Sequence, residues 1–145
     1  MFPSRYSSPI TEDSNLFHHE ASSPASITVT GSGGTVLATI SRHTEDHPGG
    51  PSEPQLVVID VAGDIDADTA PALRTVLTYA IGRDRRVCCD LSRVEFFGAA
   101  AVNTIFAALR DADGTDCQFT VRGVHGLAVQ VCQVTGLAAV LASRA

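Results

Sequence analysis

The protein is a chain of 145 residues with 16 acidic and 10 basic side chains, which gives a formal net charge of −6. A chain of this length can bury the core of one domain without disulfides or metals. All ten basic residues are arginines, so Schiff-base chemistry and a lysine-dependent phosphate loop are excluded. The acidic balance disfavours nucleic acid and anionic membranes as partners. No apolar run is long enough for a membrane helix and no secretory signal pattern is visible, so we expect a cytoplasmic protein.

The N-terminal part of the chain differs in composition from the rest. Residues 1–34 are rich in serine, proline and glycine with little periodicity, which predicts a flexible tail followed by a domain over residues 35–145. Residues 36–40 are the first clear strand candidate, and 27–30 are a candidate partner for it. Residues 43–54 contain three prolines and two glycines, which predicts a long hairpin loop.

From there onward, strand and helix patterns alternate. Apolar runs at 55–61, 86–91 and 118–121 predict three buried strands. Residues 138–141 predict a final short strand or a helical turn. An initial hairpin followed by this alternation predicts an α/β fold with a mixed β-sheet and helices packed on it.

Three helices are expected between and after these strands. The first is capped by Asp68 or Thr69 and ends at Gly82. The second covers residues 98–112, and the third ends at Gly136. The apolar residues expected to face inward are Leu73, Val76, Leu77 and Ala80 in the first helix, Val102, Ile105, Phe106 and Leu109 in the second, and Leu127, Val131 and Val134 in the third.

Three aspartates, Asp64, Asp66 and Asp68, alternate in a D-x-D-x-D pattern. A calcium loop of the EF-hand type would need glycine and glutamate at positions where this chain has Thr69 and Thr75. The phosphatase pattern D-x-D-x-[TV] also fails. Two interpretations stay open. The carboxylates are favoured near a helix N-terminus by its dipole, or they form an acidic edge that faces a protein partner.

No set of residues predicts an enzyme. The histidines are His18, His19, His43, His47 and His125, of which the first four are expected in loops or in the tail. No G-x-S-x-G nucleophile motif accompanies them, and no G-x-G-x-x-G follows a strand. Histidines and cysteines lack the spacing of zinc ligands, so neither a metal nor a cofactor is expected.

The four cysteines are Cys88, Cys89, Cys117 and Cys132. They are too few and too unevenly spaced for a disulfide framework, and we expect small buried hydrophobic side chains. A thiol-redox sensor, in which Cys117 pairs with Cys88 or Cys89, stays open as an alternative.

The segment from Asp90 to Ile105 leads from a strand through a short loop into a helix N-terminus, where backbone N–H groups can meet a phosphate. Together with the turns at 63–66 and 135–137, it resembles the STAS domain family of bacterial anti-sigma factor antagonists. That family has a D-L-S-x-V-x-F-M-D-S-S-G-L signature here, a G-E-L-D-like turn before the first helix and an S-G-L-like turn after the third. The resemblance covers roughly residues 35–143 and implies a STAS-like mixed sheet.

The resemblance also implies a function. Such domains bind an anti-sigma factor, usually a histidine-kinase-like ATPase, and free the sigma factor by partner switching. The kinase phosphorylates the second serine of the signature, and the added charge breaks the complex. Alignment of Asp90 and Phe96 with the signature places Ala100 at that serine. No hydroxyl occurs between Ser92 and Thr104, so phosphorylation at the usual site is not expected.

The expected binding surface therefore combines the start of the second helix with the acidic turn. Its residues are Gly98, Ala99, Ala100, Ala101, Asn103, Asp64, Asp66 and Asp68. The resemblance leaves two roles open, a constitutive antagonist and a degenerate module that binds another protein. A small-ligand or nucleotide sensor on the same fold is a further hypothesis, for which the sequence offers no specific pocket.

Overall fold

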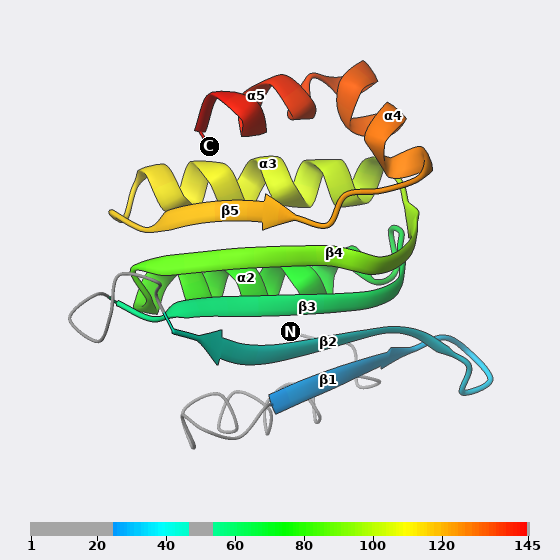
Figure 1. Ribbon diagram of the computed structural model, residues 1–145. Helices are drawn as coiled ribbons and strands as arrows, with labels where there is room; N and C mark the ends of the chain where they lie inside the picture. The colour runs from blue at the N-terminus through cyan, green and yellow to red at the C-terminus, as the bar shows by residue number, and fades with distance from the viewer. Residues whose placement is uncertain (1–24, 47–53, 145) are drawn as a thin grey trace.

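The computed structural model describes residues 25–46 and 54–144, which form a five-stranded sheet and four helices (Figure 1). In chain order the elements are β1 (Ala25–Thr30), β2 (Val36–Glu45), β3 (Leu56–Ile65), α2 (Ala70–Arg83), β4 (Arg86–Phe97), α3 (Ala99–Asp113), β5 (Gln118–Arg122), α4 (Leu127–Thr135) and α5 (Leu137–Arg144). Strands lie side by side in chain order. The first three are antiparallel neighbours, whereas β3, β4 and β5 are parallel. The predicted α/β class with a mixed sheet is confirmed.

The first two strands form the predicted hairpin, and its position corrects the expected domain boundary. Ile27 pairs with Ile40 and Thr28 with Thr39. Alternate side chains of β1 are buried, which ties this strand to the core. The sheet therefore begins at Ala25, and a boundary between residues 34 and 35 would cut the hairpin. Residues 1–24 of the expected tail lie outside the described residues.

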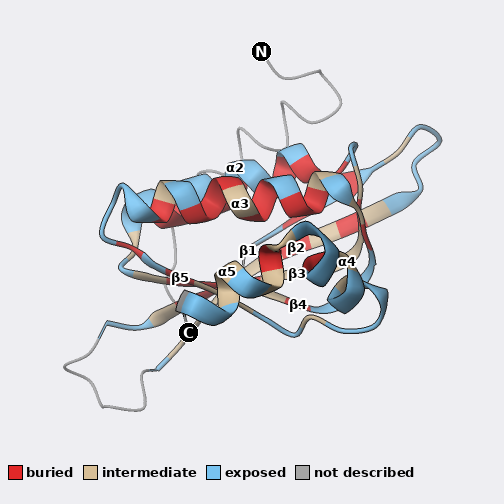
Figure 2. Ribbon diagram, turned by 90° about the horizontal axis from the view of Figure 1, so that it is seen from above, coloured by how far each residue is buried: buried red, intermediate tan, exposed pale blue. Residues whose placement is uncertain are grey.

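The core lies between the sheet and the layer formed by α2 and α3, which pack side by side on one face (Figure 2). The predicted inner residues of α2 are all buried, and so are those of α3 except the half-buried Phe106. Ala101 and Ala108 of α3 are fully buried, because short side chains let the helix approach the sheet closely.

The last two helices lie beyond β5, apart from that layer (Figures 1 and 2). Residues 138–141, for which strand and helical turn stayed open, are helical. In α4 it is Cys132 that is buried, whereas Leu127 and Val134 are 76% and 86% exposed. Their expected inward orientation is wrong. Apolar residues occur nearly all around α4, so spacing alone does not identify the face that packs inward.

The fourth strand is longer than predicted, because it continues through residues 92–97, which were expected to form a loop. Its pairing with β3 is irregular between Asp60 and Ala62 and again between Gly63 and Asp64. Each irregularity places one extra residue in β4, which is a β-bulge. The bulges break the two-residue alternation on which strand prediction relies, and Phe96 lies at the second one.

Candidate partner-binding site

The carboxyl ends of β3 and β4 bring together the two segments that were expected to bind a partner. Asp64 pairs with Phe96 and Ile65 with Phe97 in this parallel part of the sheet. The backbone N–H of Gly98 donates a hydrogen bond to the carbonyl oxygen of Ile65 at 3.3 Å. The start of α3 is thereby held beside the turn that connects β3 to α2.

The first turn of α3 exposes only part of its predicted contact residues. Gly98 is the extended N-cap residue, and its carbonyl oxygen accepts a hydrogen bond from the N–H of Ala101 at 3.0 Å. Ala99 and Asn103 are exposed, and Ala100 is half-buried. Ala101 is 0% exposed, so its expected contact with a partner is wrong. Its side chain fills the space between helix and sheet.

The three aspartates do not have equal roles. Asp66 accepts hydrogen bonds at Oδ1 from the backbone N–H groups of Asp68 and Thr69, at 2.9 and 3.2 Å. The hydroxyl of Thr69, the N-cap residue of α2, donates to the carbonyl oxygen of Asp64 at 2.7 Å. The interpretation that a carboxylate is favoured near a helix N-terminus therefore fits Asp66, whose hydrogen bonds stabilise the turn before α2. Asp68 is exposed and Asp64 is half-buried, and Asp64 pairs with Phe96 just before the start of α3.

The site occurs in a fold that is already known in other proteins. Residues 51–142 match the family model described as Mlab, STAS domain, which spans more than half of the chain. The chain belongs to this STAS domain family. The resemblance found in the sequence is thereby confirmed.

Solved structures with the same fold include anti-sigma factor antagonists. One from Mycobacterium paratuberculosis is 29% identical to this STAS domain, with a TM-score of 0.54 over 70% of this chain and 82% of that chain. The Bacillus cell fate determinant SpoIIAA in its phosphorylated form is 18% identical, with a TM-score of 0.50 over 67% and 85%, and shows the shared fold alone. No curated protein matches the chain.

The first turn of α3 in this STAS domain carries no side-chain hydroxyl. The resemblance predicts that Ala100 occupies the position of the family's phosphoacceptor serine, and this alignment stays a prediction. Thr104 is buried, and its hydroxyl donates to the carbonyl oxygen of Ala100 at 2.9 Å. Ser92 lies within β4, where its hydroxyl donates to Oδ1 of Asp90 at 2.6 Å. Neither hydroxyl is presented at the start of the helix.

The arrangement of the cysteines disfavours the redox alternative. All four thiols are buried, and burial raises the pKa of Cys88, Cys89 and Cys117, which suppresses the reactive thiolate. Gln118 pairs with Arg86, so Cys117 and Cys88 are offset by three residues along their strands. Three residues span about 10 Å, whereas a disulfide needs Cα atoms within about 7 Å. A bridge from Cys117 to Cys88 or Cys89 would require the sheet to open.

A network of charged side chains, which sequence reasoning missed, crosses β2 to β5 on the sheet face opposite α2 and α3. Arg122 donates to both carboxylate oxygens of Glu45, at 3.1 and 2.8 Å, and to Asp90 at 2.8 Å. His43 lies in β2 and not in the expected loop, and it contacts Glu45 at 2.9 Å and Asp60 at 2.6 Å. The alternation of these polar residues with buried ones was the signal that could have revealed the network.

The network keeps its carboxylates ionised. Hydrogen bonds from Arg122, and then from His43, lower the pKa of Glu45 to about 2. Burial raises the pKa of Asp90, but hydrogen bonds from Ser92 and Arg122 outweigh it and lower that pKa to about 2 as well. Groups that stay charged near neutral pH hold the strands together and are poorly suited to proton transfer.

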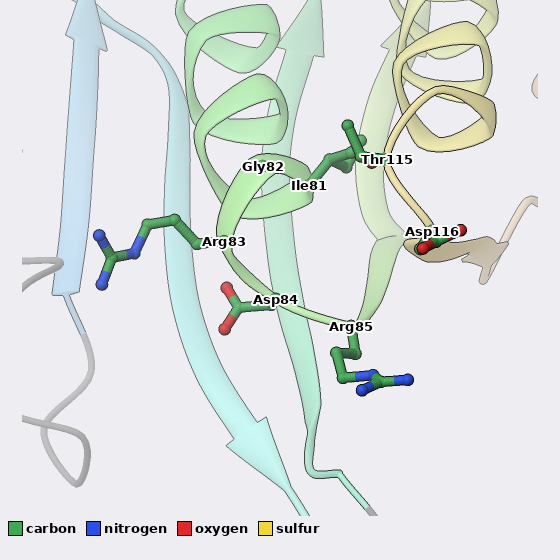
Figure 3. A pocket seen from close by; sticks show the side chains of 7 residues that line it. All are labelled: Ile81, Gly82, Arg83, Asp84, Arg85, Thr115 and Asp116. Atoms are coloured by element: carbon green, nitrogen blue, oxygen red, sulfur yellow. The ribbon is translucent and has the colours of Figure 1, made fainter.

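A hollow of about 210 Å³ lies at the opposite end of the sheet, between the end of α2 and the residues before β5 (Figure 3). Arg83 and Arg85 point to opposite sides of Asp84 (Figure 3). Burial raises the pKa of Asp84, and the charges of Arg42 and Arg83 oppose this effect. Because its charged groups diverge, the hollow does not present a convergent binding site.

Residues 25–46 and 54–144 offer neither a cluster of metal ligands nor a membrane-spanning helix. In these ranges no three histidine, cysteine or carboxylate side chains are grouped so that they could hold a metal ion. None of the helices there is long and apolar enough to cross a membrane.

Proposed function

We propose that this STAS domain is a non-enzymatic regulator that binds an anti-sigma factor of the histidine-kinase-like ATPase type. Binding would free the sigma factor that the anti-sigma factor holds. Family membership and the similarity to the 29% identical anti-sigma factor antagonist support this proposal. The proposed contact surface comprises Gly98, Ala99, Ala100 and Asn103 at the start of α3, with Asp64 and Asp68 beside it and Asp66 bracing the turn.

The observation that carries the proposal is the first turn of α3. The parallel ends of β3 and β4 hold this first turn beside the acidic turn. The resemblance implies that the family presents its phosphoacceptor serine at this place. Ala100 has no side-chain oxygen that could accept a phosphoryl group. A phosphate would add a charge of roughly −1.5 to −2 at the same edge of the sheet as the carboxylates of Asp64 and Asp68. Without that charge the complex has no off-switch at this position, so the domain acts as a constitutive antagonist.

A charge placed by mutation at the first turn tests the location of the contact. Each histidine-kinase-like anti-sigma factor of the source organism is titrated by calorimetry with the wild type, Ala100→Glu and Ala139→Glu. Ala139 is an exposed residue of α5 and controls for the added charge. We expect one anti-sigma factor to bind the wild type and Ala139→Glu alike and Ala100→Glu roughly tenfold or more weakly. Equal binding of all three, or no binding to any anti-sigma factor, would refute the proposal.

A further inference from the structure

The outer surface of α4 is an apolar face that the fold leaves uncovered. Of the nine residues of α4, only Cys132 is buried. Leu127 and Val134 are almost fully exposed, and Val131 between them is half-buried. These three residues are spaced i, i+4 and i+7, so they form one stripe along the helix. Val131 packs partly against the core, whereas Leu127 and Val134 at the two ends of the stripe have no cover within the described residues.

A groove of about 200 Å³ lies beside this stripe, between α4 and the end of β4. Phe96, which is 52% exposed, lines it from β4, and Leu127 and Val131 line it from α4. Phe96 lies two residues before Gly98, the N-cap residue of α3. The groove is therefore continuous with the proposed contact surface.

Exposed apolar side chains are concentrated here and are scarce elsewhere in the described residues. The large apolar residues that are exposed there are Val36, Phe96, Leu127, Val129 and Val134. Val36 begins β2 beside the carboxyl half of β3, and the others belong to the end of β4 or to α4. Concentration of exposed apolar surface at one end of a soluble domain marks an interaction site.

The charges around the groove indicate the kind of partner. Carboxylates of Asp64, Asp68 and Glu95 border this end of the sheet, and Glu95 lines the groove itself. Arg93 is the only basic residue among positions 92–97 of β4, and His125 lines the groove from the segment before α4. A second copy of this chain, with its net charge of −6, would bring like charges together. A partner with basic residues around an apolar one would bring opposite charges together.

We propose that the protein partner inserts an apolar side chain between Phe96 and Leu127 and surrounds it with arginine or lysine residues that face the acidic border. For the identity of that partner this inference rests on the proposed function. For the chemistry of the contact it rests on the groove, the stripe on α4 and the neighbouring carboxylates.

The first test uses the anti-sigma factor that binds the wild type. Leu127→Ser removes the apolar wall of the groove at an exposed position, and Ala139→Ser on α5 is its matched control. We expect Leu127→Ser to weaken binding roughly tenfold or more and Leu127→Met to restore it. Binding should also weaken as salt is added, because salt screens the exposed carboxylates that border the groove. Unchanged binding of Leu127→Ser overturns the inference and leaves the proposed function intact.

The second test does not depend on an anti-sigma factor. Two synthetic amphipathic helical peptides with the same leucine face are titrated into the wild type and into Leu127→Ser and followed by NMR. In one peptide arginine residues flank the leucine face, and in the other glutamate residues do. We expect only the arginine-flanked peptide to bind, with shifts at residues 94–97 and 127–134 that Leu127→Ser removes. The inference is overturned if the glutamate-flanked peptide binds or if neither peptide binds. It is also overturned if Leu127→Ser leaves the chemical shift changes unaltered, or if the protein forms a dimer that requires Leu127. If the arginine-flanked peptide binds as expected and no anti-sigma factor does, only the proposed function fails.

Discussion

Gly63 shows at the scale of one residue how the site is built. It lies inside β3 with a φ of +101°, a conformation that residues with a side chain rarely adopt. A Cβ atom there would lie 2.5 Å from the carbonyl oxygen of Leu37 in β2. The sequence pattern predicted a strand over residues 55–61 and placed Gly63 in the turn that follows it. The structure shows a different reason for glycine, because β2 passes so closely that the strand can continue to Ile65 only without a side chain.

We expect Gly63→Ala to lower the free energy of unfolding by about 2 kcal/mol or more, through backbone strain and the clash with Leu37. Gly82→Ala is the control, because Gly82 lies in α2 and a Cβ there meets no atom within 4 Å. Alanine is the better helix former, so this variant should gain roughly 0.5–1 kcal/mol. Urea unfolding of both variants measures the difference. A Gly63→Ala protein as stable as the wild type would contradict the close approach of β2.

At the scale of the element, α4 shows where prediction from sequence stops. The periodicity of α2 and α3 identified their buried faces, because polar residues occupy the other sides of both helices. In α4 the stripe of Leu127, Val131 and Val134 satisfies the same rule, yet Leu127 and Val134 are exposed and only Val131 packs partly against the core. The inward side contains Cys132, and the following helix contributes the buried Leu137. Spacing cannot rank two apolar stripes of one helix, because the choice depends on packing against elements distant in sequence.

The orientation of α4 predicts a contrast between two leucines. Leu137→Ala removes a side chain that is 1% exposed and should cost about 2–5 kcal/mol of stability. Leu127→Ala changes an exposed side chain and should stay within about 0.5 kcal/mol of the wild type. Thermal and urea unfolding provide the comparison. A large loss for Leu127→Ala would mean that this residue packs in the core after all.

The charged network across β2 to β5 predicts a dependence of stability on pH. The folded-state pKa values of Glu45 and Asp90 are both about 2, below the values of about 4 for unfolded carboxyls. A lowered folded pKa contributes stability that is fully present above the unfolded pKa and is lost as the pH falls through the folded value. Stability should therefore decrease between about pH 4 and pH 2 as these carboxylates become protonated. Because Glu45 and Arg122 are partly exposed, the contribution is modest.

Arg122→Gln isolates this contribution. We expect the wild type to lose more stability than Arg122→Gln between about pH 6 and pH 2.5, measured as the shift of the urea midpoint. The variant keeps part of the aliphatic stem but is shorter and uncharged, so it no longer holds the two carboxylates in their charged form. Identical pH profiles for the two proteins would show that the network does not stabilise the fold.

At the scale of the whole molecule, the sheet topology makes one surface from segments distant in sequence. The α/β class, the hairpin and the alternation of elements followed from sequence patterns, and three short motifs indicated the STAS family. The placement of Asp64 beside Phe96 followed only from the register of β3 and β4, which two bulges shift. The burial of Ala101 and the exposure of Phe96 depend on the same packing. Motifs could therefore locate the surface, but not identify which of its side chains are exposed.

The central claim is that this surface binds its partner without a phosphorylation switch. The measurement that tests it most directly is the intact mass of the wild type and of Ala100→Ser after incubation with ATP and the histidine-kinase-like anti-sigma factor that binds the wild type. Ala100→Ser returns a hydroxyl to the first turn of α3, and Ala139→Ser places one elsewhere. We predict that only Ala100→Ser gains a phosphate and then releases its partner, while the wild type stays unmodified and bound. Phosphate on Ser92 or Thr104 of the wild type, with loss of binding, would contradict this account.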